Sequence, residues 1–126
     1  MDREKNVILL VDDFMPLREV IRETLKKGNC GIVLEAENGR QALDILESEK
    51  VDLILSDFNM PEMDGLQLLR AVRMDSRFKE VPFIMLSSDE DPKLIIQAMS
   101  AGANEYLGKP FLGKILLQKV EKWLKK

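Results

Sequence analysis

The chain has 126 residues, enough for one domain of ordinary size, and its composition of 45% hydrophobic and 33% charged residues is typical of a globular protein. A net charge of −3 argues against direct binding to nucleic acid. No apolar run approaches the roughly 20 residues of a membrane-spanning helix, and the N-terminus lacks a signal-peptide pattern, so we expect a cytoplasmic protein without membrane insertion. The absence of histidine and the single cysteine, Cys30, exclude Ser-His-Asp and Cys-His catalysis, histidine-ligated zinc and an internal disulfide.

Five short apolar runs alternate with five stretches of helical periodicity. This pattern is typical of βα units that build a parallel sheet covered by helices on both faces. We therefore expect one α/β domain over residues 1–126. The predicted strands are Val7–Val11, Ile32–Ala36, Asp52–Ser56, Phe83–Leu86 and Glu105–Leu107.

Capping and first-turn residues predict where the helices begin. Pro16 suits the first turn of the first helix, and Asn38 with Gln41 resembles a capping box before the second. Asp64 is the expected N-cap of the third helix, and Asp91 before Pro92 that of the fourth. Apolar residues at helical spacing predict buried faces that include Val20 in the first helix, Met99 in the fourth, and Leu112, Trp123 and Leu124 in the last.

Four of the five predicted strands end in residues that carry charge or a hydroxyl group. They are Asp12 and Asp13 after the first strand, Asp57 after the third, Ser87 after the fourth and Lys109 after the fifth. Each alone could be a helix cap or a surface charge. Because the carboxyl ends of parallel strands lie together, however, we expect these five side chains to converge.

Three carboxylates in one place repel one another unless a cation lies between them. Mg²⁺ suits such a site, because it prefers oxygen ligands and typically takes one or two carboxylates together with phosphate oxygens. With a metal ion present, Lys109 and the Ser87 hydroxyl would be available to bind an added anion. The arrangement therefore indicates a site for a phosphoryl group.

These motifs, in this order, resemble the receiver domain of two-component response regulators over essentially the whole chain. The resemblance rests on Asp12-Asp13, on Asp57 followed by Met60-Pro61 and Asp64-Gly65, on Ser87, and on Lys109-Pro110. Among receivers, the sequence is most similar to the stand-alone chemotaxis regulators. The resemblance implies a flavodoxin-like (βα)₅ fold with strand order 2-1-3-4-5.

The resemblance also implies the roles of the acidic residues. Asp57 would accept the phosphoryl group. Asp13, Asp57 and the backbone carbonyl of Asn59 would ligate Mg²⁺, for which Mn²⁺ could substitute, and Asp12 would bind the ion through water. The domain would then catalyse its own phosphorylation and dephosphorylation as a signalling protein, and would not be a turnover enzyme.

The resemblance implies roles for six further positions or groups around the phosphoryl site. Lys109 and Ser87 would bind phosphoryl oxygens, and the Tyr106 ring would turn inward when the Ser87 hydroxyl moves, although Tyr106 could also simply cover a sheet edge. Asn59 and Asp89 would tune hydrolysis of the phosphate, and Ser88 would narrow access to it.

The implied phosphoryl donor is a sensor histidine kinase or a histidine phosphotransfer protein. The output partner would bind helix four, strand five and helix five, over residues 91–126. A Mg²⁺-dependent phosphatase of the haloacid dehalogenase type is an alternative, but such enzymes place a second aspartate where this chain has Asn59. An FMN carrier is a further alternative, although Asp12-Asp13-Phe14 would repel the phosphate of the cofactor.

Overall fold

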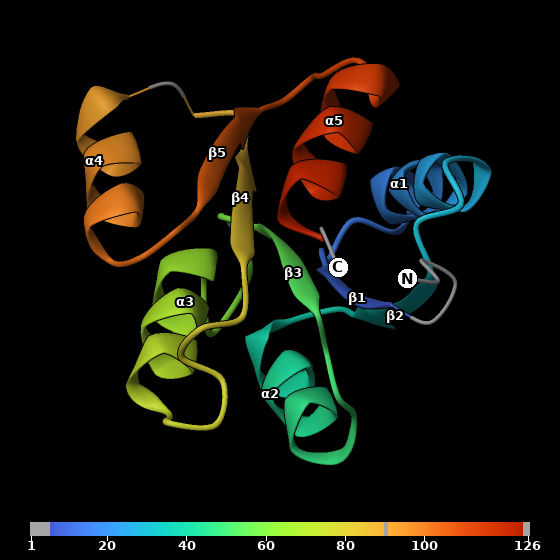
Figure 1. Cartoon of the computed structure of the whole chain (residues 1–126). Coiled ribbons are helices and arrows are strands. Elements are labelled where there is room, and N and C mark those ends of the chain that lie inside the picture. Colours follow the sequence, from blue (N-terminus) through green and yellow to red (C-terminus); the bar gives the residue numbers. More distant parts are fainter. Residues whose placement is uncertain (1–5, 90, 125–126) are drawn as a thin grey trace.

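A computed structural model describes residues 6–89 and 91–124 and shows strands and helices in strict alternation (Figure 1). The strands are β1 (Val7–Val11), β2 (Ile32–Ala36), β3 (Leu53–Asp57), β4 (Phe83–Ser87) and β5 (Glu105–Gly108). The helices are α1 (Met15–Lys27), α2 (Gly39–Ser48), α3 (Gly65–Met74), α4 (Pro92–Ser100) and α5 (Gly113–Trp123). Lys125 and Lys126, at the end of the expected output segment, lie outside the described residues.

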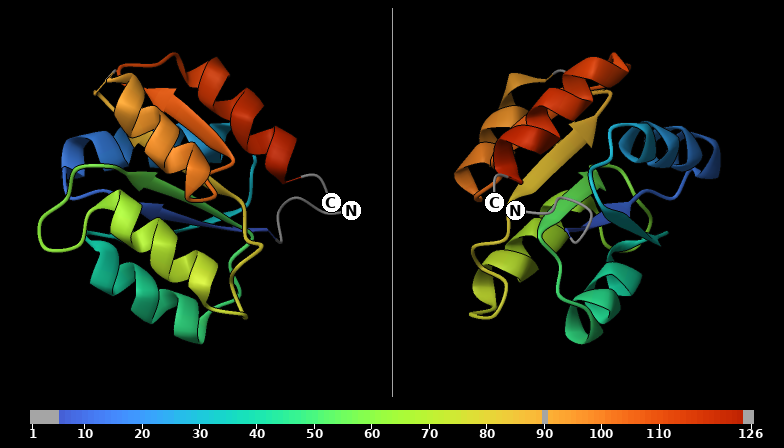
Figure 2. Two further views of the ribbon diagram at one scale, coloured as in Figure 1. Left: turned by 90° about the vertical axis from the view of Figure 1, so that its left-hand side faces the viewer. Right: turned by 45° about the vertical axis from the view of Figure 1, so that its right-hand side comes forward.

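The five strands form one parallel sheet in the order β2-β1-β3-β4-β5, which confirms the expected fold and strand order. β3 and β4 are buried along their whole length, and β1 is buried from its second residue onward. Continuous apolar runs fit this position, because a parallel strand in the middle of a sheet is covered on both faces. The strand arrowheads point the same way, so the carboxyl ends of the strands lie together (Figure 2).

Helices cover both faces of the sheet, with α1 and α5 on one face and α2, α3 and α4 on the other (Figure 1). Successive side chains of a strand point to opposite faces, so Ile8 and Leu10 of β1 pack with α1 and α5, whereas Leu9 and Val11 pack with the other three helices. Two apolar layers thus hold the sheet rigid. In the part of the chain described, no helix is long and apolar enough to cross a membrane.

The strands differ from their predicted bounds at the ends. β3 begins and ends one residue later than expected, and β4 and β5 each extend one residue further, to Ser87 and Gly108. Asp52 lies just before β3, where its carboxylate accepts the N–H of Val7 at 2.8 Å. The backbone N–H of Asp52 still donates to the carbonyl of Val7 at 2.8 Å, so the side chain of Asp52 replaces a backbone partner for the N–H of Val7 alone.

The helix starts agree with the sequence signals, with one difference. Asp64 and Gln67 form a reciprocal capping box, and the carboxylate of Asp91 accepts the N–H of Lys93. The Asn38 side chain accepts the N–H of Gln41, but the Gln41 side chain accepts the N–H of Glu37 and not that of Asn38. The reciprocal capping box expected there is therefore not formed.

Three residues predicted to face the core are exposed. Val20, Met99 and Leu112 expose 60%, 44% and 66% of their surface. Leu112 is the N-cap of α5 and precedes its amphipathic turns, and α4 buries only Ala98 completely, so Met99 has little core to reach. In α1 the buried residues are Arg18, Ile21 and Leu25, a face that excludes Val20 and includes a charged side chain.

Candidate functional site

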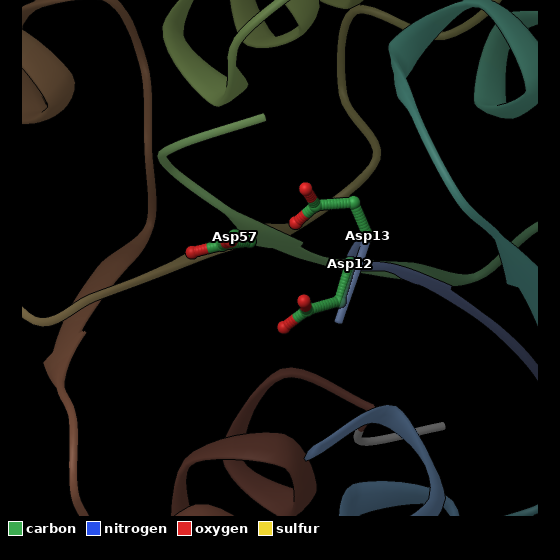
Figure 3. Close-up of side chains that lie close together, drawn as sticks. All are labelled: Asp12, Asp13 and Asp57. Carbon is green, nitrogen blue, oxygen red and sulfur yellow. The ribbon is translucent and has the colours of Figure 1, made fainter. Parts of the chain in front are cut away.

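Three aspartates meet at the carboxyl ends of β1 and β3. One carboxylate oxygen from each of Asp12, Asp13 and Asp57 lies within 4.8 Å of the others. Figure 3 shows Asp12 and Asp13 following the end of β1, beside Asp57 at the end of β3. The predicted convergence of these residues is confirmed, and it arises because β1 and β3 are hydrogen-bonded neighbours.

The three aspartates differ in their exposure to solvent. Asp12 is completely buried and Asp57 is 6% exposed, whereas Asp13 is exposed. The N–H of Asp12 donates to the carbonyl of Ala36 at 3.0 Å, which continues the β1–β2 pairing by one bond, and its carboxylate accepts the N–H of Phe14 at 2.9 Å. Backbone bonds on both sides therefore fix Asp12 in place.

Lys109 brings a positive charge to this cluster from the end of β5. Its Nζ lies 2.8 Å from Oδ1 of Asp57 and 3.5 Å from Oδ2 of Asp12. One ammonium group does not neutralise three carboxylates. The remaining negative charge is the reason to expect a further cation at this site.

The carboxyl group of Asp57 is tuned by opposing effects. Burial raises its pKa above the ordinary value, and the charge of Asp12 acts in the same direction. The hydrogen bond and charge of Lys109 and the backbone N–H of Asn59 lower it, but burial outweighs them. The anionic form of Asp57 is therefore less stabilised in the folded protein than it is in water.

The donor set fits a hard divalent cation. The three groups offer only carboxylate oxygens, they approach one another closely enough to share an ion, and one of them remains open to solvent. Oxygen ligands of this kind suit Mg²⁺, which keeps several of its waters.

Ser87 is the last residue of β4 and is completely buried. Its hydroxyl oxygen accepts the N–H of Asp89 at 3.0 Å, so it closes the first turn of the β4–α4 loop. The hydroxyl of Tyr106, in the middle of β5, donates to the backbone carbonyl of Asp89 at 2.9 Å. Asp89 therefore links the two residues through its backbone, one through its N–H and the other through its carbonyl.

The remaining predicted site residues lie on the loops around the cluster. Asn59, in the β3–α3 loop, is exposed and its backbone N–H acts on Asp57. Ser88 and Asp89 are exposed in the β4–α4 loop, where the Asp89 carboxylate accepts the N–H of Asp91 at 2.9 Å. The structure thus brings Asp12, Asp13, Asp57 and Lys109 together, whereas Ser87 and Tyr106 contact the β4–α4 loop.

Two further residues shape the site. Gly65 begins α3 directly against the end of β3, where an added Cβ would overlap the backbone carbonyl oxygen of Asp57. The Asp64-Gly65 motif marked this position in the sequence. Arg18 was missed in the sequence, although an arginine three residues before Ile21 and seven before Leu25 lies on the same helical face.

Comparisons with known proteins agree with this geometry. Residues 8–121 match the family described as the response regulator receiver domain. The chemotaxis protein CheY1 of Helicobacter pylori is 42% identical over 115 residues, which cover 90% of this chain and 93% of that protein.

Two solved structures show the same fold. The chemotaxis protein CheY4 of Vibrio cholerae is similar with a TM-score of 0.89 and 34% identity, covering 95% of this chain and 99% of that one. The receiver domain of the sensor histidine kinase PA1611 from Pseudomonas aeruginosa, solved with a magnesium ion coordinated in its active site cleft, has a TM-score of 0.88 and 30% identity. That similarity covers 97% of this chain and 99% of the other.

Proposed function

The chain belongs to the response regulator receiver domain family, and we propose that it is a signalling switch of a two-component pathway that accepts a phosphoryl group on Asp57. The observation that carries the proposal is the position of Asp57, a nearly buried carboxylate at a strand end between Lys109 and the acidic pair Asp12-Asp13.

The proposed reaction transfers a phosphoryl group from a phosphohistidine to Asp57. A carboxylate oxygen of Asp57 attacks phosphorus, and the new P–O bond forms as the P–N bond to the imidazole breaks and the imidazole leaves with a proton. The proposed donor is a sensor histidine kinase or a histidine phosphotransfer protein, and the phosphohistidine lies outside this sequence, which contains no histidine.

The acidic cluster is the proposed site for Mg²⁺. Asp13, Asp57 and the backbone carbonyl of Asn59 would hold the ion directly and Asp12 would hold it through water, with Mn²⁺ as a predicted substitute. When bound, the ion would neutralise carboxylate and phosphoryl charge. Lys109 already lies 2.8 Å from the attacking carboxylate, and there it can neutralise charge on the incoming phosphoryl oxygens.

We place the output at α4, β5 and α5. Ser87 and Tyr106 both bind the backbone of Asp89, so a Ser87 hydroxyl that turned toward a phosphoryl oxygen would release one end of the β4–α4 loop. The phosphoryl group would thereby shift the population of two loop arrangements and present a changed surface to an output protein. The similarity to chemotaxis proteins suggests an output in chemotaxis.

Dephosphorylation is the proposed role of the loop residues Asn59, Asp89 and Ser88. Asn59 and Asp89 are exposed in the loops that follow β3 and β4, from which their side chains would orient or exclude a water molecule, and Ser88 would limit access to the phosphoryl group. An amide at Asn59 cannot transfer a proton as the second aspartate of a dehalogenase-type phosphatase does, so we expect no turnover of phosphate esters.

The proposal is tested by incubating the protein with acetyl phosphate and Mg²⁺ and measuring its intact mass. We expect the mass of one phosphoryl group to be added, and we expect Asp57→Asn to abolish the addition. Asp52→Asn is the matched control, because Asp52 precedes the same strand at its other end and an amide oxygen can still accept the N–H of Val7. Phosphorylation of Asp57→Asn, or none of the parent protein, would contradict the proposal.

A further inference from the structure

Arg18 is one of the few charged residues buried in the described part of the chain, and only 7% of it is exposed. It lies in the first turns of α1, on the face that packs against the sheet with Ile21 and Leu25. A buried guanidinium group is costly unless its donors are satisfied. Its hydrogen-bond partners therefore indicate what it does.

The guanidinium group of Arg18 joins the two strands β1 and β2 near their carboxyl ends. Its Nη1 donates to the backbone carbonyl of Asp12 at 2.7 Å, and its Nε donates to Oε1 of Glu35 on β2 at 2.8 Å. The other oxygen of Glu35 lies 3.2 Å from Nε of Arg22. Glu35 thus orients the guanidinium group, and the guanidinium group binds Asp12.

The carbonyl that Arg18 binds belongs to the peptide bond between the two acidic residues. Because a peptide bond is planar, the direction of the Asp12 carbonyl also fixes the N–H and the Cα of Asp13, from which the Asp13 side chain extends. The N–H of Asp12 is held by Ala36, and its carboxylate is held by the N–H of Phe14. Among these bonds, the one from Arg18 is the contact that sets the peptide between Asp12 and Asp13.

We propose that Arg18 is a positioning residue for the divalent cation site, acting by holding the Asp12–Asp13 peptide so that both carboxylates point at the ion. The inference rests on the proposed function in that it takes this acidic cluster as the Mg²⁺ site. The bond from Arg18 to Asp12 goes to the backbone carbonyl and not to the carboxylate, so the proposed effect of Arg18 on the ion passes through the backbone.

The geometry of arginine suits this role better than that of lysine. Arginine presents several N–H donors in a rigid plane and can bind two acceptors in different directions, as it does here with a carbonyl and a carboxylate. The carboxylate of Glu35 also offsets the positive charge of Arg18, which would otherwise oppose the binding of a cation nearby. We therefore expect the direction of the hydrogen bond to matter more than the charge.

The experiment measures Mg²⁺ binding to the protein without phosphodonor by isothermal titration calorimetry, together with the free energy of unfolding in urea. Arg18→Met keeps an unbranched side chain in the buried space but removes the donors, and we expect it to weaken Mg²⁺ binding by about 10-fold, as removal of a group that orients a metal ligand typically does. Arg18→Lys should restore little of this affinity, because one ammonium group cannot reproduce both bonds.

Arg22→Ala is the matched control, since it removes the other arginine that pairs with Glu35 and leaves the bond from Arg18 to the Asp12 carbonyl in place. We expect its Mg²⁺ affinity to equal that of the parent protein. A folded Arg18→Met variant that binds Mg²⁺ as tightly as the parent would overturn the inference. If Arg18→Lys binds normally, charge alone is sufficient, and the proposed positioning role is equally overturned.

Two outcomes keep the inference separate from the function on which it rests. If the parent protein binds no Mg²⁺ at millimolar concentration, the proposed function fails before Arg18 is tested. Should Arg18→Met not fold, Glu35→Ala replaces it, because truncating this partly exposed residue removes the acceptor that orients the guanidinium group and leaves Arg18 in the buried space. Unchanged Mg²⁺ affinity in both Glu35→Ala and Arg18→Lys would then count against the inference.

Discussion

At the amino ends of the strands, polar side chains bind the backbone; at the carboxyl ends, the charged side chains also face one another. Arg73 is the main example at the amino ends. It donates through Nε and Nη2 to the carbonyl of Gly102 and through Nη1 to that of Val81, and Nη2 also reaches Oδ1 of Asn104. Asn104 in turn accepts the N–H of Phe83 at 2.8 Å.

These bonds at the amino ends supply partners to backbone groups that the sheet leaves free. Asp52 does the same for the first N–H of β1. Burial lowers the pKa of Arg73, whereas the negative charge of Glu80 raises it. The guanidinium group remains charged, because arginine titrates far above neutral pH.

At the carboxyl ends the balance is different. Asp12 and Asp57 are buried, and Lys109 is shared between them. The charges do not cancel, and burial keeps the pKa of Asp57 raised. Side chains at the amino ends thus satisfy backbone groups, whereas the carboxyl ends keep an unbalanced negative charge, which suits the Mg²⁺ and phosphoryl site that we propose there.

The largest stability loss is expected from Arg73→Ala. The substitution leaves the carbonyls of Gly102 and Val81 and the side chain of Asn104 without this donor, so the free energy of unfolding should fall by about 3 kcal/mol. Urea unfolding measures the loss. Arg77→Ala is the control, because its pairs with Glu47 and Asp75 are exposed and its loss should be much smaller. Equal losses in the two variants would show that the hydrogen bonds of Arg73 stabilise the fold no more than the exposed ion pairs of Arg77 do.

Lys109→Met should cost less stability, but it should make that stability depend on Mg²⁺. Without Lys109, Asp57 and Asp12 lose their cationic partner, and we expect a loss of about 2 kcal/mol in EDTA, discounted for the partial exposure of Lys109. Added Mg²⁺ should recover part of it. Stability equal to that of the parent protein in EDTA would show that the charges at the carboxyl ends do not interact as described.

Asp57→Asn should act in the opposite direction. Burial disfavours the charged form of Asp57, so a neutral amide of the same shape should raise the free energy of unfolding in EDTA by about 1 kcal/mol, as substitutions at functional sites often do. The parent protein should gain more from added Mg²⁺ than the variant does. Asp52→Asn is again the control and should not be stabilised, since Asp52 serves the backbone at the amino ends. A less stable Asp57→Asn would contradict this view of the site.

The smallest effect is expected at Glu105, at the amino end of β5. Although burial raises its pKa, hydrogen bonds from Trp123, Lys119 and Lys122 lower it below the ordinary 4.5. A carboxyl group with a lowered folded pKa stabilises the protein above its unfolded pKa, and this stability is lost as the pH falls through the folded value.

Glu105→Gln should therefore cost less than about 1 kcal/mol at neutral pH, in the range of surface ion pairs. The difference from the parent protein should disappear as the pH is lowered below 4.5. Urea unfolding at a series of pH values measures it. A difference that stays constant down to acid pH would show that packing against Trp123, and not charge, is responsible.

The sequence alone determined the fold and most of the site. Apolar runs and capping residues predicted five strands and five helices, although the strand ends moved by a residue where Asp52 binds Val7. The convergence of Asp12, Asp57 and Lys109 could be predicted because parallel strands bring their carboxyl ends together whatever lies between them in the chain. The strand order came from the resemblance to a known family, and not from the pattern of residues.

Only the tertiary structure decided how each helix is rotated against the sheet and which backbone group each polar side chain reaches. In α1 the sequence allows a buried face with Val20 or one with Arg18, since positions two apart differ by about 200° around the helix, and contact with β1 and β2 selects Arg18. The shared bonds of Ser87 and Tyr106 to Asp89 depend likewise on the path of one loop. Arg18 lies 17 residues from Glu35 in the chain, and Tyr106 lies 17 residues from Asp89, so local periodicity carries no information about these contacts.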